Sequence, residues 1–331
     1  MLDAFMALHR DRTREVVLAR GGHPLPDAES CAAGEAALRV ADANRARGET
    51  LVVLLSGGAS AMIEAPAEGV TLEHLIDVTR ELLRSGRPIA AMNARRKELS
   101  AIKGGKLALR AGRSTTYAIS DVHAPVEDDP AVIGSGPTVL PEAVAGVDAH
   151  FFIAGSRRDA MAGASVEAKG LGYRVRLIAP PTLGEAREAA KSFAALTGDD
   201  AAAGVSPPMS VIGAGETTVR LDPQHAGRGG RNQEFALAAA LEIGRPERTR
   251  DTRRADWALA SVGTDGIDGP TAAAGAIVDP TTLSRAAAAG LDPRAALDAH
   301  DSYPFFERLG DLVLTGPTGT NVGDLQVFLR Q

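Results

Sequence analysis

The feature that most constrains this chain is a regular alternation of short apolar runs with longer segments of helical periodicity. Strand-like runs lie at 51–62 (running into a glycine turn), 115–122, 150–155 and 173–179, and helical segments lie at 28–47, 71–84, 93–110, 157–171 and 184–197. This order is typical of βαβ units and a parallel sheet. We therefore predict an α/β protein whose ligands bind beyond the carboxyl ends of the strands.

A change of composition near residue 200 predicts two domains. Residues 198–208, GDDAAAGVSPP, are small and polar and end in two prolines, which is typical of a linker. The next segment, MSVIGAGETTVRL, begins a second series of apolar runs and glycine turns. We predict a larger N-terminal domain at 1–204 and a smaller α/β domain at 205–331.

Composition excludes several classes of protein. The net charge of -6 argues against general nucleic-acid binding. The single cysteine, Cys31, excludes an internal disulfide and fits a reducing compartment. No apolar run approaches the roughly 18 residues that a membrane span needs. We predict a cytoplasmic protein with no membrane partner; a homo-oligomer is compatible with the sequence.

The motif LLSGGASA at 54–61 is a candidate anion site. A strand that ends in Ser56, Gly57 and Gly58, with Ser60 following, leaves backbone N–H groups at the start of a helix, where a phosphate or carboxylate can bind. It is not a Walker A sequence, which needs Gly-Lys-Ser/Thr. The alternative is a tight turn with a purely structural role.

A second candidate is the basic segment NARRKELSAIKGGKLA at 93–108. Only 5 of the 36 basic residues of the chain are lysines, yet three of them, Lys97, Lys103 and Lys106, lie here. We expect Lys97 and Lys103 to bind an anion, with Gly104 and Gly105 allowing the backbone to approach it. The alternative is a solvated basic helix face.

The segment ISDVHAPVEDDPAVIGSGPT at 119–138 supplies acids beside these cations. Asp121 lies at the end of a predicted strand, so it is the candidate metal ligand, since Mg²⁺ prefers hard oxygen ligands. Asp128 and Asp129 fit turn formation better.

The predicted second domain carries three further motifs. In GAGETTVRL, Glu216 follows what we predict to be a glycine turn; in GRGGRNQE, Arg231 and Asn232 open a helix after a flexible glycine segment. An arginine so placed can offset charge in phosphoryl transfer. The loop TGPTGTNVGDL at 315–325 is rich in small hydroxyls, with Asn321 and Asp324 as its polar residues.

Two acids lie on the glycine-rich stretch SVGTDGIDGP. Asp265 is our candidate for contacting metal-bound phosphate or substrate hydroxyls, and Asp268 fits a turn-forming role better.

Taken together, these motifs resemble the glycerate 2-kinase family, whose C-terminal module is called MOFRL. Eight segments occur in the order and approximate spacing of that family: GGHPLPDAES, LLSGGASAM, NARRKELSAIKGGKLA, ISDV…DDPAVIGSGPT, GETTV, GRGGRNQEFALA, GTDGIDGPTAAAGA and TGPTGTNVGDL.

The resemblance implies ATP- and Mg²⁺-dependent phosphoryl transfer to the 2-hydroxyl of D-glycerate. It implies a Rossmann-like, doubly wound N-terminal domain, a smaller MOFRL domain and a site between them. The active-site arginine of the family matches Arg231, and its glycine-rich and Lys-Gly-Gly segments match Ser56–Ser60 and Lys97–Gly105. The chemistry agrees, because phosphoryl transfer needs cations, backbone donors and carboxylates rather than covalent catalysis.

The chain also departs from the family pattern. The family carries an N-terminal Gly-Lys-Ala segment whose lysine is thought to be catalytic, but no lysine precedes Lys97 here. The chain has Gly-Gly-Ala-Ser for Gly-Gly-Gly-Ser and Ala91 where the family has a glutamate. We therefore expect either a start upstream of Met1 or a member with weakened or lost activity.

Two other functions are open on the sequence. A nicotinamide-dependent hydroxypyruvate reductase would need a Gly-x-Gly-x-x-Gly turn after a strand, which GAGETT at 213–218 matches only in part. A non-catalytic nucleotide-binding remnant is the other.

Overall fold

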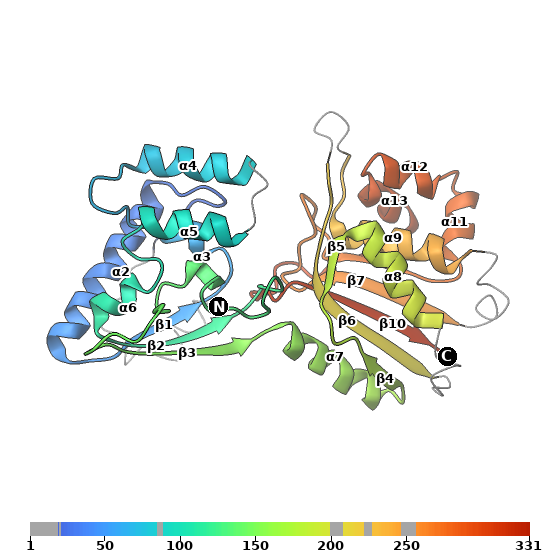
Figure 1. Ribbon diagram of the computed structural model, residues 1–331. Helices are drawn as coiled ribbons and strands as arrows, with labels where there is room; N and C mark the ends of the chain where they lie inside the picture. The colour runs from blue at the N-terminus through green and yellow to red at the C-terminus, as the bar shows by residue number, and fades with distance from the viewer. Residues whose placement is uncertain (1–18, 20, 85–88, 199–207, 222–226, 246–255) are drawn as a thin grey trace. The chain divides into compact units, whose positions relative to one another are not determined.

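The protein forms two compact units. The computed structural model describes the chain except residues 1–18, 20, 85–88, 199–207, 222–226 and 246–255, and its units comprise residues 1–154 and 155–331. Each unit combines a β-sheet with helices, which confirms the predicted α/β class (Figure 1).

The first unit is built on a three-stranded sheet in the order β1-β2-β3. β1 (Leu51–Leu55) and β2 (Arg113–Ile119) run parallel, as the alternation of elements predicts, and β3 (Asp148–Gly155) lies beside β2. The other elements are α2 (Ala28–Arg47), α3 (Ala59–Met62), α4 (Leu72–Arg84), α5 (Ile89–Leu99), α6 (Lys106–Ala111) and the short 3-10 helix η1 (Ile133–Ser135).

One predicted helix of this unit is interrupted. The segment 93–110 divides into the end of α5 and the whole of α6, because Gly104 and Gly105 have φ angles of +65° and +83°. These angles are costly for residues with a side chain. α5 has already ended at Leu99, and the two glycines turn the chain into α6, whose N-cap residue is Gly105.

The second unit contains a seven-stranded sheet in the order β4-β6-β10-β7-β8-β9, with β5 also paired to β6. Its strands are β4 (Arg174–Leu177), β5 (Thr182–Glu185), β6 (Met209–Thr218), β7 (Trp257–Gly263), β8 (Gly275–Val278), β9 (Leu312–Val313) and β10 (Asp324–Arg330). Its helices are α7 (Arg157–Gly170), α8 (Ala186–Gly198), α9 (Arg231–Ile243), α11 (Thr282–Ala288), α12 (Pro293–Asp298) and α13 (Ser302–Leu309).

The predicted parallel arrangement holds for only part of this sheet. β4 and β5 run parallel to β6, whereas β10, β7, β8 and β9 are joined by antiparallel pairings. Only parallel neighbours need a long crossover, and the segment that links β7 to β8 is too short for one.

Both faces of this sheet are covered, with α8 and α9 on one side and α7 on the other (Figure 1). Because successive side chains of a strand point to opposite faces, the residues of β6 pack alternately on the two sides of the sheet. Val211 belongs to the same apolar cluster as Phe235 of α9, while its neighbour Ile212 packs with Met161 of α7. Helix α9 is therefore a core element, and its first turn is held in place by the sheet beneath it.

The units divide earlier than the predicted domain boundary at 204/205. Residues 155–198 belong with the second unit because β4 pairs with β6 in its sheet and α8 shares an apolar cluster with α9. The predicted linker at 198–208 lies almost wholly outside the described residues. In the described part of the chain, no helix has the length and apolarity to cross a membrane; the cytoplasmic location stays a prediction.

Candidate active site

The first turn of α9 is capped by an acid from a distant loop. The helix begins at Arg231, as predicted, and its N-cap residue, Gly230, has no side chain to bond the free N–H groups. Asp268 caps the helix instead: its two carboxylate oxygens accept from the backbone N–H groups of Asn232 (3.0 Å) and Gln233 (2.9 Å). A Cβ at Gly230 would lie 2.2 Å from the Asp268 carboxyl carbon, so only glycine leaves room for this cap.

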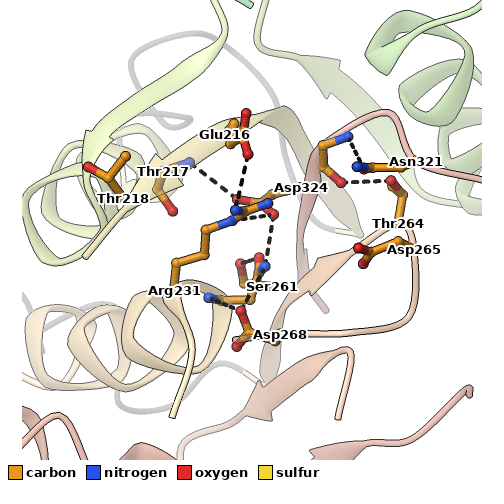
Figure 2. Close-up of polar contacts among 12 residues, drawn as sticks. Glu216, Thr217, Thr218, Arg231, Ser261, Thr264, Asp265, Asp268, Asn321 and Asp324 are labelled. Atoms are coloured by element: carbon orange, nitrogen blue, oxygen red, sulfur yellow. Dashed lines mark hydrogen bonds and ion pairs between the residues drawn. The ribbon is translucent and has the colours of Figure 1, made fainter. Parts of the chain in front are cut away.

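Arg231 lies between two acids (Figure 2). Its Nε donates to both carboxylate oxygens of Asp324, at 3.0 and 2.9 Å, and its terminal nitrogen lies 3.1 Å from Glu216. Asp324 is fully buried, whereas Arg231 keeps 33% of its side chain exposed. The guanidinium is therefore fixed from behind and still accessible to an anion in solvent.

Asn232 joins the two buried acids to one another. Its amide nitrogen donates to Asp324 at 2.9 Å and, more weakly, to Asp268 at 3.3 Å. Its amide oxygen accepts from the hydroxyl of Ser261 on β7 at 2.7 Å, which fixes the orientation of the amide. The network thus ties α9 to β7, to β10 and to the loop that carries Asp268.

Burial changes the titration of these groups. It raises the pKa of Asp268 to about 6, against the lowering effect of the N–H groups of Asn232 and Gln233. Burial likewise raises the pKa of Asp324, although Arg231 opposes the shift. The pKa of Arg231 is raised: burial would lower it, but Asp324 and Glu216 outweigh that effect.

The two acids of GTDGIDGP have structural roles that differ from those expected. Asp268, expected to form the turn, is 1% exposed and caps α9. Asp265 forms the turn, because its carboxylate accepts from the N–H of Ile267 at 3.0 Å. Contact between Asp265 and a ligand stays a prediction.

The loop before β10 lies against the end of β7. Asn321 accepts from the N–H of Gly323 at 3.0 Å, and the hydroxyl of Thr264 donates to the carbonyl of Gly323 at 2.7 Å (Figure 2). Asn321 is therefore part of the same region as Thr264 and Asp265, as the predicted site requires.

Glu216 does not follow a glycine turn, so that part of the prediction is wrong. The stretch 213–218 lies inside β6 and pairs with β10 and β5. Its glycines are needed because β5 approaches closely: a Cβ at Gly215 would lie 2.2 Å from the carbonyl oxygen of Thr182. The strand–turn–helix geometry of a dinucleotide fingerprint does not exist at this stretch.

In the first unit, the predicted anion and metal residues meet at the carboxyl ends of β1 and β2. Ser56, Gly57 and Gly58 follow β1, and Asp121 lies so close that a Cβ at Gly57 would be 2.0 Å from its Oδ2. Burial raises the pKa of this carboxyl. Ser60 shares a 2.7 Å hydrogen bond with Ser135 of the GSGP loop. Ligand binding there stays a prediction.

Lys103 is neither a solvated surface residue nor exposed to an anion. It is 1% exposed, and its ammonium group is bonded to the buried carboxylate of Glu64. Burial lowers the pKa of Lys103 and Glu64 raises it, the first effect being the larger. Ser100 donates to the other oxygen of Glu64 at 2.5 Å. The structure therefore gives Lys103 a place in the core of the first unit.

The backbone donors of the Lys-Gly-Gly segment are also engaged. The N–H groups of Gly104 and Gly105 donate to the carbonyls of Ser135 and Gly136, at 3.0 and 2.8 Å. Lys97 is half-buried, with the carbon atoms of its side chain against Gly104, and its contact with an anion stays a prediction. Among the described residues, no group of three or more His, Cys, Asp or Glu side chains could hold a metal.

Sequence reasoning missed three residues that organise these regions: Asp324, Ser261 and Glu64. The sequence pattern indicates only that Asp324 is a polar residue at the end of a loop, whereas it is the first residue of β10 and faces Arg231. Ser261 and Glu64 lie in or near apolar runs, and a polar residue in such a run is the signal that could have indicated a buried partner.

Comparison with known proteins gives two family matches. A family model described as a domain of unknown function (DUF4147) matches residues 4–154, and the MOFRL family model matches residues 209–324. The first ends where the first compact unit ends, and the second starts at the first residue of β6.

Individual relatives match over nearly the whole chain. A protein of Agrobacterium vitis with the provisional name hydroxypyruvate reductase is 37% identical, covering 97% of this chain and 90% of its own length. A protein of Thermotoga maritima named D-glycerate 2-kinase is 35% identical, covering 93% of this chain and 78% of its own. The crystal structure of the glycerate kinase of Thermotoga maritima superposes with a TM-score of 0.81 at 34% identity, covering 93% of this chain and 79% of that one.

The titration of Asp268 predicts a pH dependence of stability. The folded pKa of about 6 exceeds the ordinary 3.8, so the folded state binds the proton more tightly. The part of the free energy of unfolding that comes from this proton is complete below pH 3.8 and is lost as the pH rises to about 6. It amounts to about 3 kcal/mol. Relative to Asp268→Asn, the wild type should lose this free energy of unfolding between pH 4 and 7. Urea titrations followed by the fluorescence of the single tryptophan, Trp257, measure the free energy of unfolding at each pH. If wild type and Asp268→Asn showed the same pH dependence, Asp268 would not be the titrating group.

The Lys103–Glu64 pair makes a second prediction. Lys103→Met leaves a buried carboxylate without its cation and should cost about 3–5 kcal/mol. The double variant Lys103→Met with Glu64→Gln should recover most of that loss. Scanning calorimetry checks both. If Lys103→Met were as stable as the wild type but bound ATP at least tenfold more weakly, Lys103 would be a phosphate ligand rather than a core residue.

Proposed function

The chain belongs to the glycerate kinase family, and from that premise we propose that it transfers the terminal phosphoryl group of ATP to the 2-hydroxyl of D-glycerate. The products are 2-phosphoglycerate and ADP. Relatives named glycerate 2-kinase, from Pyrococcus horikoshii and Thermotoga maritima, are 34% and 35% identical to this chain. The alternative is a nicotinamide-dependent reductase. Its partial dinucleotide motif at 213–218 lies inside β6 and does not form the turn that such a motif needs.

The observation that carries the proposal is the fixed and accessible guanidinium of Arg231. Phosphoryl transfer spreads negative charge over the oxygens of the transferred group, and a preorganised cation stabilises that charge without reorganising during the reaction. Asp324 holds Nε, so the group cannot rotate freely, and the 33% exposure of the side chain leaves it open to phosphate. Glu216, 44% exposed, balances the charge until the phosphate arrives.

The first unit supplies residues suited to the Mg²⁺–ATP complex. Asp121 offers the hard carboxylate oxygen that Mg²⁺ takes in nucleotide sites, where phosphates and water provide the remaining ligands. Mg²⁺ held there would neutralise charge on the phosphates. The turn Ser56–Gly58 presents backbone groups beside Asp121, and Lys97 adds a cation. Lys103, Gly104 and Gly105 support this region rather than bind the nucleotide.

The test of this function uses the purified full-length chain. With ATP, Mg²⁺ and D-glycerate it should form 2-phosphoglycerate, which ³¹P NMR distinguishes from 3-phosphoglycerate. No product from a folded sample that binds ATP would indicate a non-catalytic nucleotide binder. Oxidation of NADH with hydroxypyruvate would indicate the reductase instead.

Replacing the arginine gives the residue-level prediction. Arg231→Ala should lower kcat by about 100-fold or more, because a charge-stabilising group of the transition state is lost. Arg245→Ala, two residues beyond the far end of α9 and 51% exposed, removes the same charge away from the site and should leave kcat unchanged. Steady-state kinetics with both variants measure the difference, and equal kcat values would remove Arg231 from the reaction.

A further inference from the structure

A cavity of about 470 Å³ lies within the second unit, beside the end of β7. Segments that are far apart in the sequence line it: the start of α7, the end of β7 with Thr264, and the loop before β10, with Ala274 and Val313 beside them. Two of these are the GTDG and TGPTGTNV motifs, which sequence reasoning selected as candidate ligand loops and which the reaction proposed above does not use. Their meeting around one cavity of ligand size indicates a binding site.

The walls of this cavity are apolar even though many of its residues are threonines. Val262, Ala274, Val322 and Leu325 contribute aliphatic surface. Three of the four threonines that line the cavity direct their hydroxyl groups to the backbone: Thr264 donates to Gly323, Thr315 to Gly316, and Thr318 to Thr264. With these three protons engaged, the loop offers mostly apolar surface.

The cavity is not suited to a phosphate. The start of α7 would attract an anion, but its capping box is complete: Ser156 accepts from the N–H of Arg158, and Asp159 accepts from the N–H of Ser156. Asp159 also lines the cavity and brings a negative charge. An apolar wall with one acid at its edge suits a flat, uncharged ring that carries hydroxyl groups, since the acid can accept from them.

The cavity and Arg231 are connected through the same strand ends. Gly263, which lines the cavity, is the register partner of Asp324, which holds Arg231. Successive residues of β10 alternate between the two faces of the sheet: Asp324 points to α9, and Leu325 packs on the α7 side and lines the cavity. The guanidinium and the cavity therefore lie on opposite faces of the sheet, and a ligand that reached both would have to cross the ends of β7 and β10.

We propose that this cavity binds the adenine and ribose of ATP, with the ring against Val262 and Val322 and the ribose hydroxyls toward Asp159. This proposal rests on the proposed ATP-dependent function. It assigns the GTDG and TGPTGTNV loops to nucleoside recognition.

Two variants that fill the cavity from opposite walls test the proposal. Ala160→Phe projects from α7, and Thr320→Phe projects from the loop before β10. Each should raise the Kd of ATP at least tenfold, measured by isothermal titration calorimetry, and should leave the KM of D-glycerate within twofold. Val166→Phe is the matched control, since Val166 is on the same helix and 72% exposed. Its Kd for ATP should equal that of the wild type.

The outcomes separate this proposal from the function on which it rests. An unchanged Kd for ATP in either variant, with a wild-type melting temperature, overturns the nucleoside site, as does a rise in the KM of D-glycerate alone. If Ala160→Phe does not fold, Thr320→Phe decides, because its side chain starts on an exposed loop. A wild-type protein that binds ATP but forms no 2-phosphoglycerate defeats the proposed function while the calorimetry still tests the cavity.

Discussion

The second unit depends on one interaction, the bond between the buried carboxylate of Asp324 and the guanidinium of Arg231. A carboxylate with no exposure carries a large desolvation cost unless charged or polar partners surround it. Here Arg231, Asn232 and the N–H of Thr217 supply them. Because these partners come from α9 and β6, and Asp324 itself begins β10, satisfying one acid fixes the relative positions of three elements.

The same requirement explains why the surroundings of Arg231 are rigid. Asp268 must be partnered where it is buried, and it is partnered by the first turn of α9. Asn232 bonds both acids and is oriented by Ser261. A guanidinium held in such a network is ready before the substrate arrives, which is the condition for electrostatic catalysis. The cost is a pair of buried carboxylates whose pKa values burial raises.

The sequence predicted the parts of this structure that depend on local chemistry. The α/β class, the parallel pairing of β1 with β2 and the helix that opens at Arg231 all follow from strand ends, glycine turns and periodicity. What it missed depends on contacts between distant residues. A charge pattern alone does not distinguish Lys103 in an exposed helix from Lys103 bonded to Glu64. Nor does it show that Asp268, rather than Asp265, caps α9.

The most direct test of this account is the rate of phosphoryl transfer in a single turnover of Asp324→Asn. The substitution keeps the size of the side chain and removes the charge that holds Nε of Arg231. The account predicts a rate at least tenfold lower in a protein that still folds and binds ATP with a Kd close to that of the wild type, and a lower melting temperature, because Arg231 loses its buried counter-charge. An unchanged rate in a folded variant would show that Arg231 does not need Asp324, and would contradict the central claim.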